Sequence, residues 1–101
     1  MKMWLDDNRK APEGWLWVKS VDEAIQYCTV FGFDEIEEMS LDHDLGKDAP
    51  TGYDFVKWME TQASMNNEDI PLMIFSHSMN PVGRKNIENA VEAIYKQMGL
   101  L

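Results

Sequence analysis

The sequence predicts one small α/β domain over residues 1–101, in which a mainly parallel sheet of four strands and three helices form three layers. Two observations predict this class. Short apolar segments of strand length alternate with longer segments whose apolar residues recur at helical spacing. The 101 residues, 45% of them hydrophobic, are enough for one core and leave little room for a second domain.

Three helices are predicted from their start and stop signals. Each begins at a residue whose side-chain oxygen can accept a backbone N–H, namely Ser20, Thr51 and Asn80. Each ends at a glycine or a polar stretch, namely Gly32, residues 65–69 and Gly99. Glu23 completes a capping box at the first start, and Pro81 occupies the first helical position at the third.

Four apolar segments are predicted strands: Met1–Leu5, Trp15–Val18, Met39–Leu41 and Leu72–Phe75. We expect the first strand inside the sheet and next to the third, because Met3–Leu5 is apolar throughout and suits burial on both faces. Only residues 6–14 join the first two strands, and a parallel crossover usually takes a dozen residues or more, so the direction of the second strand stays open. All four tryptophans are expected in the core.

Charge and composition argue against several classes of function. The net charge of −9 repels phosphate backbones, so neither broad nucleic-acid binding nor binding to anionic membranes is expected, whereas a small phosphate ligand is compatible. No segment approaches the roughly 18 apolar residues of a membrane helix, and residues 1–20 lack a signal-peptide pattern. Cys28 is the single cysteine, which suits a reducing cytoplasm and argues against a cysteine-based zinc cluster.

Acidic residues follow two predicted strands, at the edge where the carboxyl ends of parallel strands meet. Asp6 and Asp7 follow the first strand, and Asp42, His43 and Asp44 follow the third. Adjacent carboxylates repel one another unless a cation or a proton compensates. We therefore expect the four aspartates to bind a divalent metal, Mg²⁺ or Mn²⁺ before zinc, because carboxylate oxygens suit hard cations. The alternative is that the aspartates only cap turns and His43 is structural.

The fourth strand runs into His77, directly before the third helix. A helix N-terminus offers unpaired backbone N–H groups and a positive dipole end, which favour an anion. Hydroxyl, amide and guanidinium groups around it, and after the first strand, are candidate phosphate ligands: Ser76, Ser78, Asn80, Arg84 and Arg9. The alternative is that Asn80 only starts the helix and Arg84 faces water.

Four segments together resemble the cyclic-phosphate processing receiver-like domain over nearly the whole chain: Leu5–Arg9 with Pro12, Leu41–Gly46, Thr51–Asp54 with Trp58, and His77–Asn86. The resemblance implies a truncated flavodoxin-like or receiver-like fold. It implies that Asp6 and Asp7 match the receiver's Mg²⁺-binding pair. It also implies that Asp42 matches the phosphate-accepting aspartate and Ser76 the hydroxyl residue after the fourth strand.

Departures from the ordinary receiver favour hydrolysis over phospho-relay signalling. By comparison with an ordinary receiver, we expect neither the fifth strand with its lysine nor the first helix, whereas His43 and His77 are added. We expect a metal-assisted phosphodiesterase that processes a cyclic phosphate on RNA ends or on a nucleotide derivative. His77, or His43, would be the general acid or base, and Asp42 belongs to the catalytic set. The alternatives are a non-catalytic module that binds metal and a protein partner, and a degenerate phosphate-accepting domain centred on Asp42.

Overall fold

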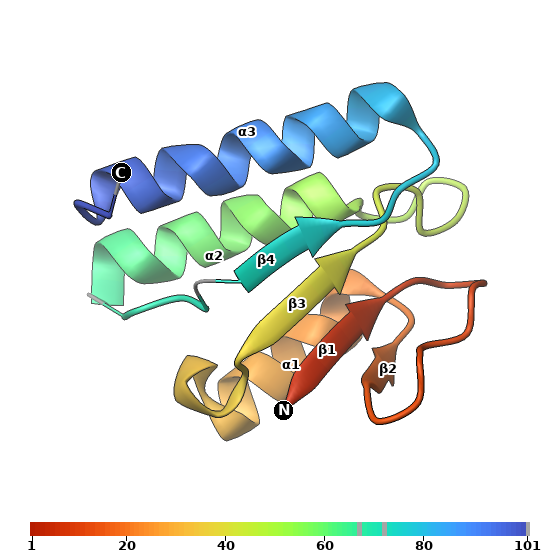
Figure 1. Cartoon of the computed structure of the whole chain (residues 1–101), viewed down its shortest axis with the longest axis horizontal. Coiled ribbons are helices and arrows are strands. Elements are labelled where there is room, and N and C mark those ends of the chain that lie inside the picture. The colour runs from red at the N-terminus through yellow and green to blue at the C-terminus, as the bar shows by residue number, and fades with distance from the viewer. Residues whose placement is uncertain (67, 72, 101) are drawn as a thin grey trace.

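The computed structural model describes residues 1–66, 68–71 and 73–100. Its parallel sheet has the strand order β2-β1-β3-β4 (Figure 1). The strands are β1 (Lys2–Leu5), β2 (Leu16–Val18), β3 (Glu38–Leu41) and β4 (Met73–Ser76). The helices are α1 (Val21–Phe31), α2 (Gly52–Asn66), α3 (Pro81–Gln97) and the short 3₁₀ helix η1 (Phe33–Glu35). The predicted four-stranded sheet with three α-helices is confirmed; the predicted start of the fourth strand, Leu72, lies outside the described residues.

β1 lies inside the sheet between β2 and β3, as predicted. Leu5 pairs with Val18 of β2 on one side and with Leu41 of β3 on the other. β2 runs parallel to β1, which the sequence left open. A connection without a helix suffices because β2 is only about 10 Å long, whereas ten residues can span about 33 Å.

All three α-helices lie on one face of the sheet, so the domain has two layers and the predicted three-layer arrangement is wrong (Figure 1). The crossovers from β2 to β3 and from β3 to β4 run in the same direction across the sheet. Because such crossovers are right-handed, they place α1 and α2 on the same face. α3 packs beside α2 there. Within the described residues, no helix joins β1 to β2, and therefore no helix covers the opposite face of the sheet.

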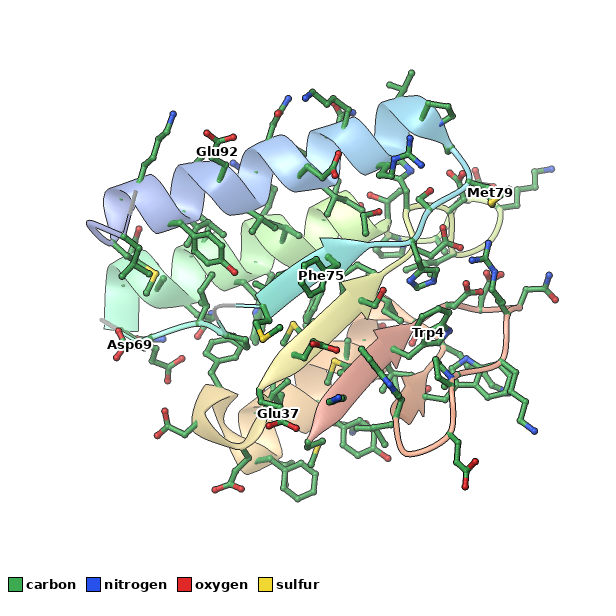
Figure 2. The ribbon with its side chains drawn as sticks, in the orientation of Figure 1. Trp4, Glu37, Asp69, Phe75, Met79 and Glu92 are labelled. Atoms are coloured by element: carbon green, nitrogen blue, oxygen red, sulfur yellow. The ribbon has the colours of Figure 1, made fainter. Side chains whose placement is uncertain are left out.

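The alternation of side chains along the strands agrees with two layers. The residues that face the helices are fully buried in the core: Met3, Leu5, Met39 and Leu41. The opposite face carries a row formed by Trp4, Ser40 and Phe75, one from each of three adjacent strands. Phe75 is 52% exposed there (Figure 2). This helix-free face adjoins the carboxyl ends of the strands.

Capping hydrogen bonds confirm the predicted helix starts. The Ser20 hydroxyl accepts the N–H of Glu23 at 3.1 Å, and the carboxylate of Asp54 accepts the N–H of Thr51 at 2.8 Å. Asn80 Oδ1 accepts two N–H groups of the first turn of α3, at 3.1 and 3.2 Å. Within the described residues, no helix combines the length and the apolar character needed to cross a membrane.

The tryptophans are not fully buried core residues, which corrects the prediction. Each of them is half-buried: Trp4, Trp15, Trp17 and Trp58. Trp58 packs against the core from α2, whereas Trp4 and Trp15 meet edge to face at 6.0 Å. An indole carries an N–H that favours a position where a polar partner is within reach, and the sheet edge offers such positions.

We predict that Gly52→Ala destabilises the protein, although Gly→Ala inside a helix normally stabilises it by up to about 1 kcal/mol. A Cβ at Gly52 would lie 2.0 Å from the backbone oxygen of Asp42, so α2 would have to move. We expect the free energy of unfolding, measured with urea, to fall by about 1–3 kcal/mol. Ser64→Ala, at an exposed position of the same helix, should stay within about 0.5 kcal/mol of wild type. A stability of Gly52→Ala equal to wild type would contradict this close approach.

Candidate functional site

Asp6 is a buried carboxylate, only 2% exposed, directly after β1. Its Oδ1 accepts the backbone N–H groups of Asn8 (2.8 Å) and Arg9 (2.6 Å). These two hydrogen bonds fold residues 6–9 into a tight turn at the sheet edge. Its Oδ2 lies 2.9 Å from Nε2 of His77, which follows β4. Both oxygens of this buried group are therefore hydrogen-bonded, as a buried polar group requires.

The surroundings of Asp6 act on its pKa in opposite directions. Burial by itself raises the pKa of Asp6, because desolvation disfavours the charged form. Hydrogen bonds from Arg9, Asn8 and His77 outweigh this effect and hold the pKa below its ordinary value. Asp6 is therefore ionised at neutral pH, and its buried negative charge attracts a cation.

The His77 ring is held on three sides. Its Nδ1 lies 2.8 Å from the hydroxyl of Ser40, and its Nε2 contacts Asp6. The ring stacks on the indole of Trp4, with centroids 3.7 Å apart and planes 5° apart. Its backbone oxygen accepts a hydrogen bond from the guanidinium of Arg9 at 3.4 Å. Both ring nitrogens of His77 are thus occupied.

The segment after β3 forms a second hydrogen-bonded chain. Asp42 Oδ1 accepts the N–H of His43 at 2.8 Å, and Nδ1 of His43 lies 3.1 Å from Oδ1 of Asp44. Asn80 donates its amide to Oδ2 of Asp44 at 3.3 Å. These hydrogen bonds, first from His43 and then from Asn80, lower the pKa of Asp44. The His43 ring packs against Gly83, where a Cβ would lie 2.4 Å from its Cγ, so α3 holds this ring in place.

An open cavity of about 510 Å³ lies between the hydrogen-bonded groups around Asp6 and those around Asp44. The residues that line it are Asp6, Asp7, Asn8, Arg9, Asp42, Asp44 and Gly46. All four aspartates that the sequence predicts as metal ligands thus lie at one cavity. A larger hollow of about 920 Å³ is lined by residues 20–31 alone and includes none of the predicted site residues.

One ligand atom from each of Asp6, Asp42 and His77 lies within 4.8 Å of the others. Mg²⁺ binds carboxylate oxygens at about 2.1 Å, so a cation between the two carboxylates needs only small side-chain movements. The donor set fits a hard cation, because the residues that line the cavity supply carboxylate oxygens and no thiolate.

Of the predicted phosphate ligands, Arg9 lines the cavity, whereas Arg84 is exposed in the first turn of α3. The other three make hydrogen bonds to the backbone. Ser76 donates its hydroxyl to the Leu41 backbone oxygen (3.0 Å). The hydroxyl of Ser78 accepts the N–H of Asn80 (3.1 Å), and Asn80 caps α3.

Three residues near the site were missed by sequence reasoning: Ser40, Trp4 and Trp17. The indole N–H of Trp17 donates to the backbone oxygen of Asp6 at 2.7 Å, and that of Trp4 donates to the backbone oxygen of Arg9 at 2.9 Å. The two indoles therefore support both ends of the turn. A signal for Ser40 and Trp4 existed, because each lies two positions before a site carboxylate and thus on the same face of its strand.

Residues 1–93 match the family described as the cyclic-phosphate processing receiver domain. The match includes all four strands and every residue of the two hydrogen-bond networks around Asp6 and Asp44. It confirms the resemblance seen in the sequence. No curated protein and no solved structure matches the chain.

We predict that Asp6 makes stability depend on pH in the acid range. Because its pKa is lower in the folded state than the unfolded value of about 3.9, its contribution is complete above the unfolded value. That contribution is lost as the pH falls through the folded value. When the free energy of unfolding is measured with urea in buffers from neutral to acid pH, it should fall less for Asp6→Asn than for wild type. An exposed residue that does not titrate provides the control: Ser64→Ala should keep the wild-type slope. A wild-type slope in Asp6→Asn would contradict the assignment.

Proposed function

Because the chain belongs to the cyclic-phosphate processing receiver domain family, we propose that it is a metal-assisted hydrolase. It would open a cyclic phosphate ester on an RNA end or on a nucleotide derivative. The observation that supports this most is the cavity, where aspartates from two strand ends and Arg9 line one space. Phosphoester hydrolysis by a metal site needs these two kinds of group, anionic ligands for the cation and a cationic group for the phosphate.

Asp6 and Asp42 would hold the cation, Mg²⁺ or Mn²⁺, with Asp7 and Asp44 at the wall of the same cavity. When bound, such a cation lowers the pKa of a coordinated water and neutralises charge on the phosphate. Asp6 suits the role because its lowered pKa keeps it anionic without a cation. Asp42 suits it because its Oδ1 is already oriented by the N–H of His43.

The phosphate would be held by Arg9, whose planar guanidinium can donate two parallel hydrogen bonds to phosphate oxygens. Arg9 is anchored near the site because its own N–H and its backbone oxygen are both hydrogen-bonded, to Asp6 and Trp4. Arg84, exposed at the start of α3, would contact a part of the substrate outside the cavity. Asn80 would contribute by holding Asp44 and the helix terminus.

We assign the acid–base step to His43. Its Nδ1 is oriented by Asp44, and its Nε2 makes no hydrogen bond among the described residues. An imidazole oriented by a carboxylate, with its second nitrogen unbound, suits proton transfer. A water oxygen would bond to phosphorus and lose one proton to solvent, and the ring P–O ester bond would break with its electron pair on the leaving oxygen. His43 Nε2 would donate a proton to that oxygen and regain one from solvent, so that one water yields a phosphomonoester and an alcohol.

A second candidate, a non-catalytic module that binds metal and a protein partner, has one observation in its favour. The helix-free face of the sheet exposes large apolar side chains, Phe75 at 52% and Met73 at 48%. Exposed apolar groups that lie side by side on one face are typical of interaction surfaces. Both candidates need the cation, but only the hydrolase needs His43.

We predict that Mg²⁺ or Mn²⁺ raises the melting temperature, because a cation relieves repulsion between Asp6 and Asp42. A cation that binds the folded state alone raises the free energy of unfolding by about 2.7 kcal/mol when free metal is 100-fold above its dissociation constant. The double variant Asp6→Asn with Asp42→Asn should remove the shift in thermal melts. The control with the same change of charge, Asp34→Asn with Glu35→Gln in η1, should keep it. A melting temperature that does not respond to metal would argue strongly against the site.

We predict turnover of a cyclic phosphate that depends on His43. The panel consists of 2′,3′-cyclic nucleotides, RNA with a cyclic-phosphate end and ADP-ribose cyclic phosphate, each with Mg²⁺ or Mn²⁺. His43→Gln should lower kcat by a factor of about 10² to 10⁴, and His77→Ala should also lower it, by disturbing Asp6. Arg9→Lys should reduce activity although the charge is kept, because lysine cannot donate two parallel hydrogen bonds to phosphate as a planar guanidinium does. Lys85→Ala, on the exposed side of α3, is the control. Absence of turnover on the panel, or full activity in His43→Gln, would refute the hydrolase.

A further inference from the structure

We infer that Ser40, His77 and Trp4 form a positioning relay that fixes Asp6 as a one-oxygen ligand, and that His77 does not bind the cation itself. The inference deepens the proposed function and rests on it in one respect, namely that Asp6 is a cation ligand. It assigns roles to Ser40 and Trp4, and it removes His77 from both the ligand set and the proton-transfer step.

The first argument is the hydrogen-bonding capacity of Asp6. A carboxylate oxygen has two lone pairs. Oδ1 accepts two N–H groups, from Asn8 and Arg9, so no lone pair is left on it. Oδ2 accepts one hydrogen bond, from His77, so one lone pair remains. A cation therefore reaches Asp6 through Oδ2 alone, and the direction of that lone pair depends on where His77 holds the oxygen.

The second argument is the state of the His77 ring. Because the carboxylate oxygen of Asp6 is the acceptor of this contact, Nε2 carries the hydrogen, which leaves Nδ1 as the one ring nitrogen that could offer a lone pair. Ser40 occupies that lone pair, at 2.8 Å. The ring thus has no lone pair with which to bind a cation, and no nitrogen with which to reach a substrate. Histidine and carboxylate partners of this kind commonly orient a metal ligand from outside the coordination sphere.

The third argument is the burial of Ser40 on a face without helices. Ser40 is 7% exposed, although Phe75 beside it in the same row is half exposed. The stacked rings of Trp4 and His77 lie on this side of the sheet, as Figure 2 shows for Trp4. A buried hydroxyl costs free energy unless it is hydrogen-bonded, and the contact that satisfies Ser40 is its hydrogen bond with Nδ1 of His77. A serine at this position is therefore explained by the relay.

Trp4 connects the relay to the turn that holds Asp6. Its ring fixes the plane of His77 by stacking, and its indole N–H donates to the backbone oxygen of Arg9. Arg9 in turn donates its N–H to Oδ1 of Asp6. The two oxygens of Asp6 are thus held from two directions by groups that share one tryptophan.

The test measures Mn²⁺ affinity by calorimetry, without substrate. We expect His77→Ala and Ser40→Ala to weaken binding by about 10- to 100-fold, the usual effect of removing an outer partner of a ligand. His77→Gln should restore most of the affinity, because the glutamine amide can donate to Oδ2 as Nε2 does. Ser64→Ala is the matched serine control and should bind as wild type. Circular dichroism of each variant identifies any that fails to fold.

Nitrogen-15 NMR of the His77 ring, in alkaline buffer where imidazole is neutral, gives a readout that needs no turnover. We expect hydrogen on Nε2 and none on Nδ1, in a pattern that Mg²⁺ leaves unchanged and Ser40→Ala disturbs. Hydrogen on Nδ1, a large Mg²⁺-induced shift of a ring nitrogen, or wild-type Mn²⁺ affinity in His77→Ala would each overturn the relay. Absent turnover with the expected affinities would refute the hydrolase and leave the relay standing, whereas absent Mn²⁺ binding by wild type would overturn both.

Discussion

The burial of one ionised carboxylate is the constraint on which the rest of the site depends. An unpartnered charge in the interior costs several kcal/mol, so Asp6, at 2% exposure, needs every hydrogen bond that it receives. The turn after β1 donates two backbone N–H groups to its carboxylate, from Asn8 and Arg9. Trp4 and Trp17 hold the backbone oxygens at the two ends of that turn. His77, which follows β4 on the far side of β3, supplies the remaining donor.

No helix lies between β1 and β2 in the part of the chain that the structure describes, and this explains the surroundings of the carboxylate. Both crossovers place their helices on one face of the sheet, so the other face near β1 is left to side chains. The stacked Trp4 and His77 rings lie on that face, and Ser40 is buried there without any helix above it. His77 therefore has a structural place in this chain, because it covers the strand and contacts Asp6 at once.

The sequence predicted what local physics determines. Capping residues such as Ser20 and Asn80 indicate where helices start, and the rule for parallel strands places Asp6 and Asp42 at one edge of the sheet. The number of layers could not be predicted, because it follows from the order of strands in the sheet and from the handedness of the crossovers. The partners of His77 could not be predicted either. Ser40 is 37 residues away along the chain, and only the register between strands brings the two together.

A crystal structure with Mn²⁺ and inorganic phosphate, with anomalous scattering used to locate manganese, would test whether Asp6 and Asp42 hold a cation while His77 only positions Asp6. We expect one strong anomalous peak at coordination distance from Oδ2 of Asp6 and from Asp42, with phosphate on the same cation and beside Arg9. The contact between His77 and Asp6 should persist. A peak coordinated by a nitrogen of His77, or manganese found only away from the cavity, would show that Asp6 and Asp42 do not hold the cation in the way proposed.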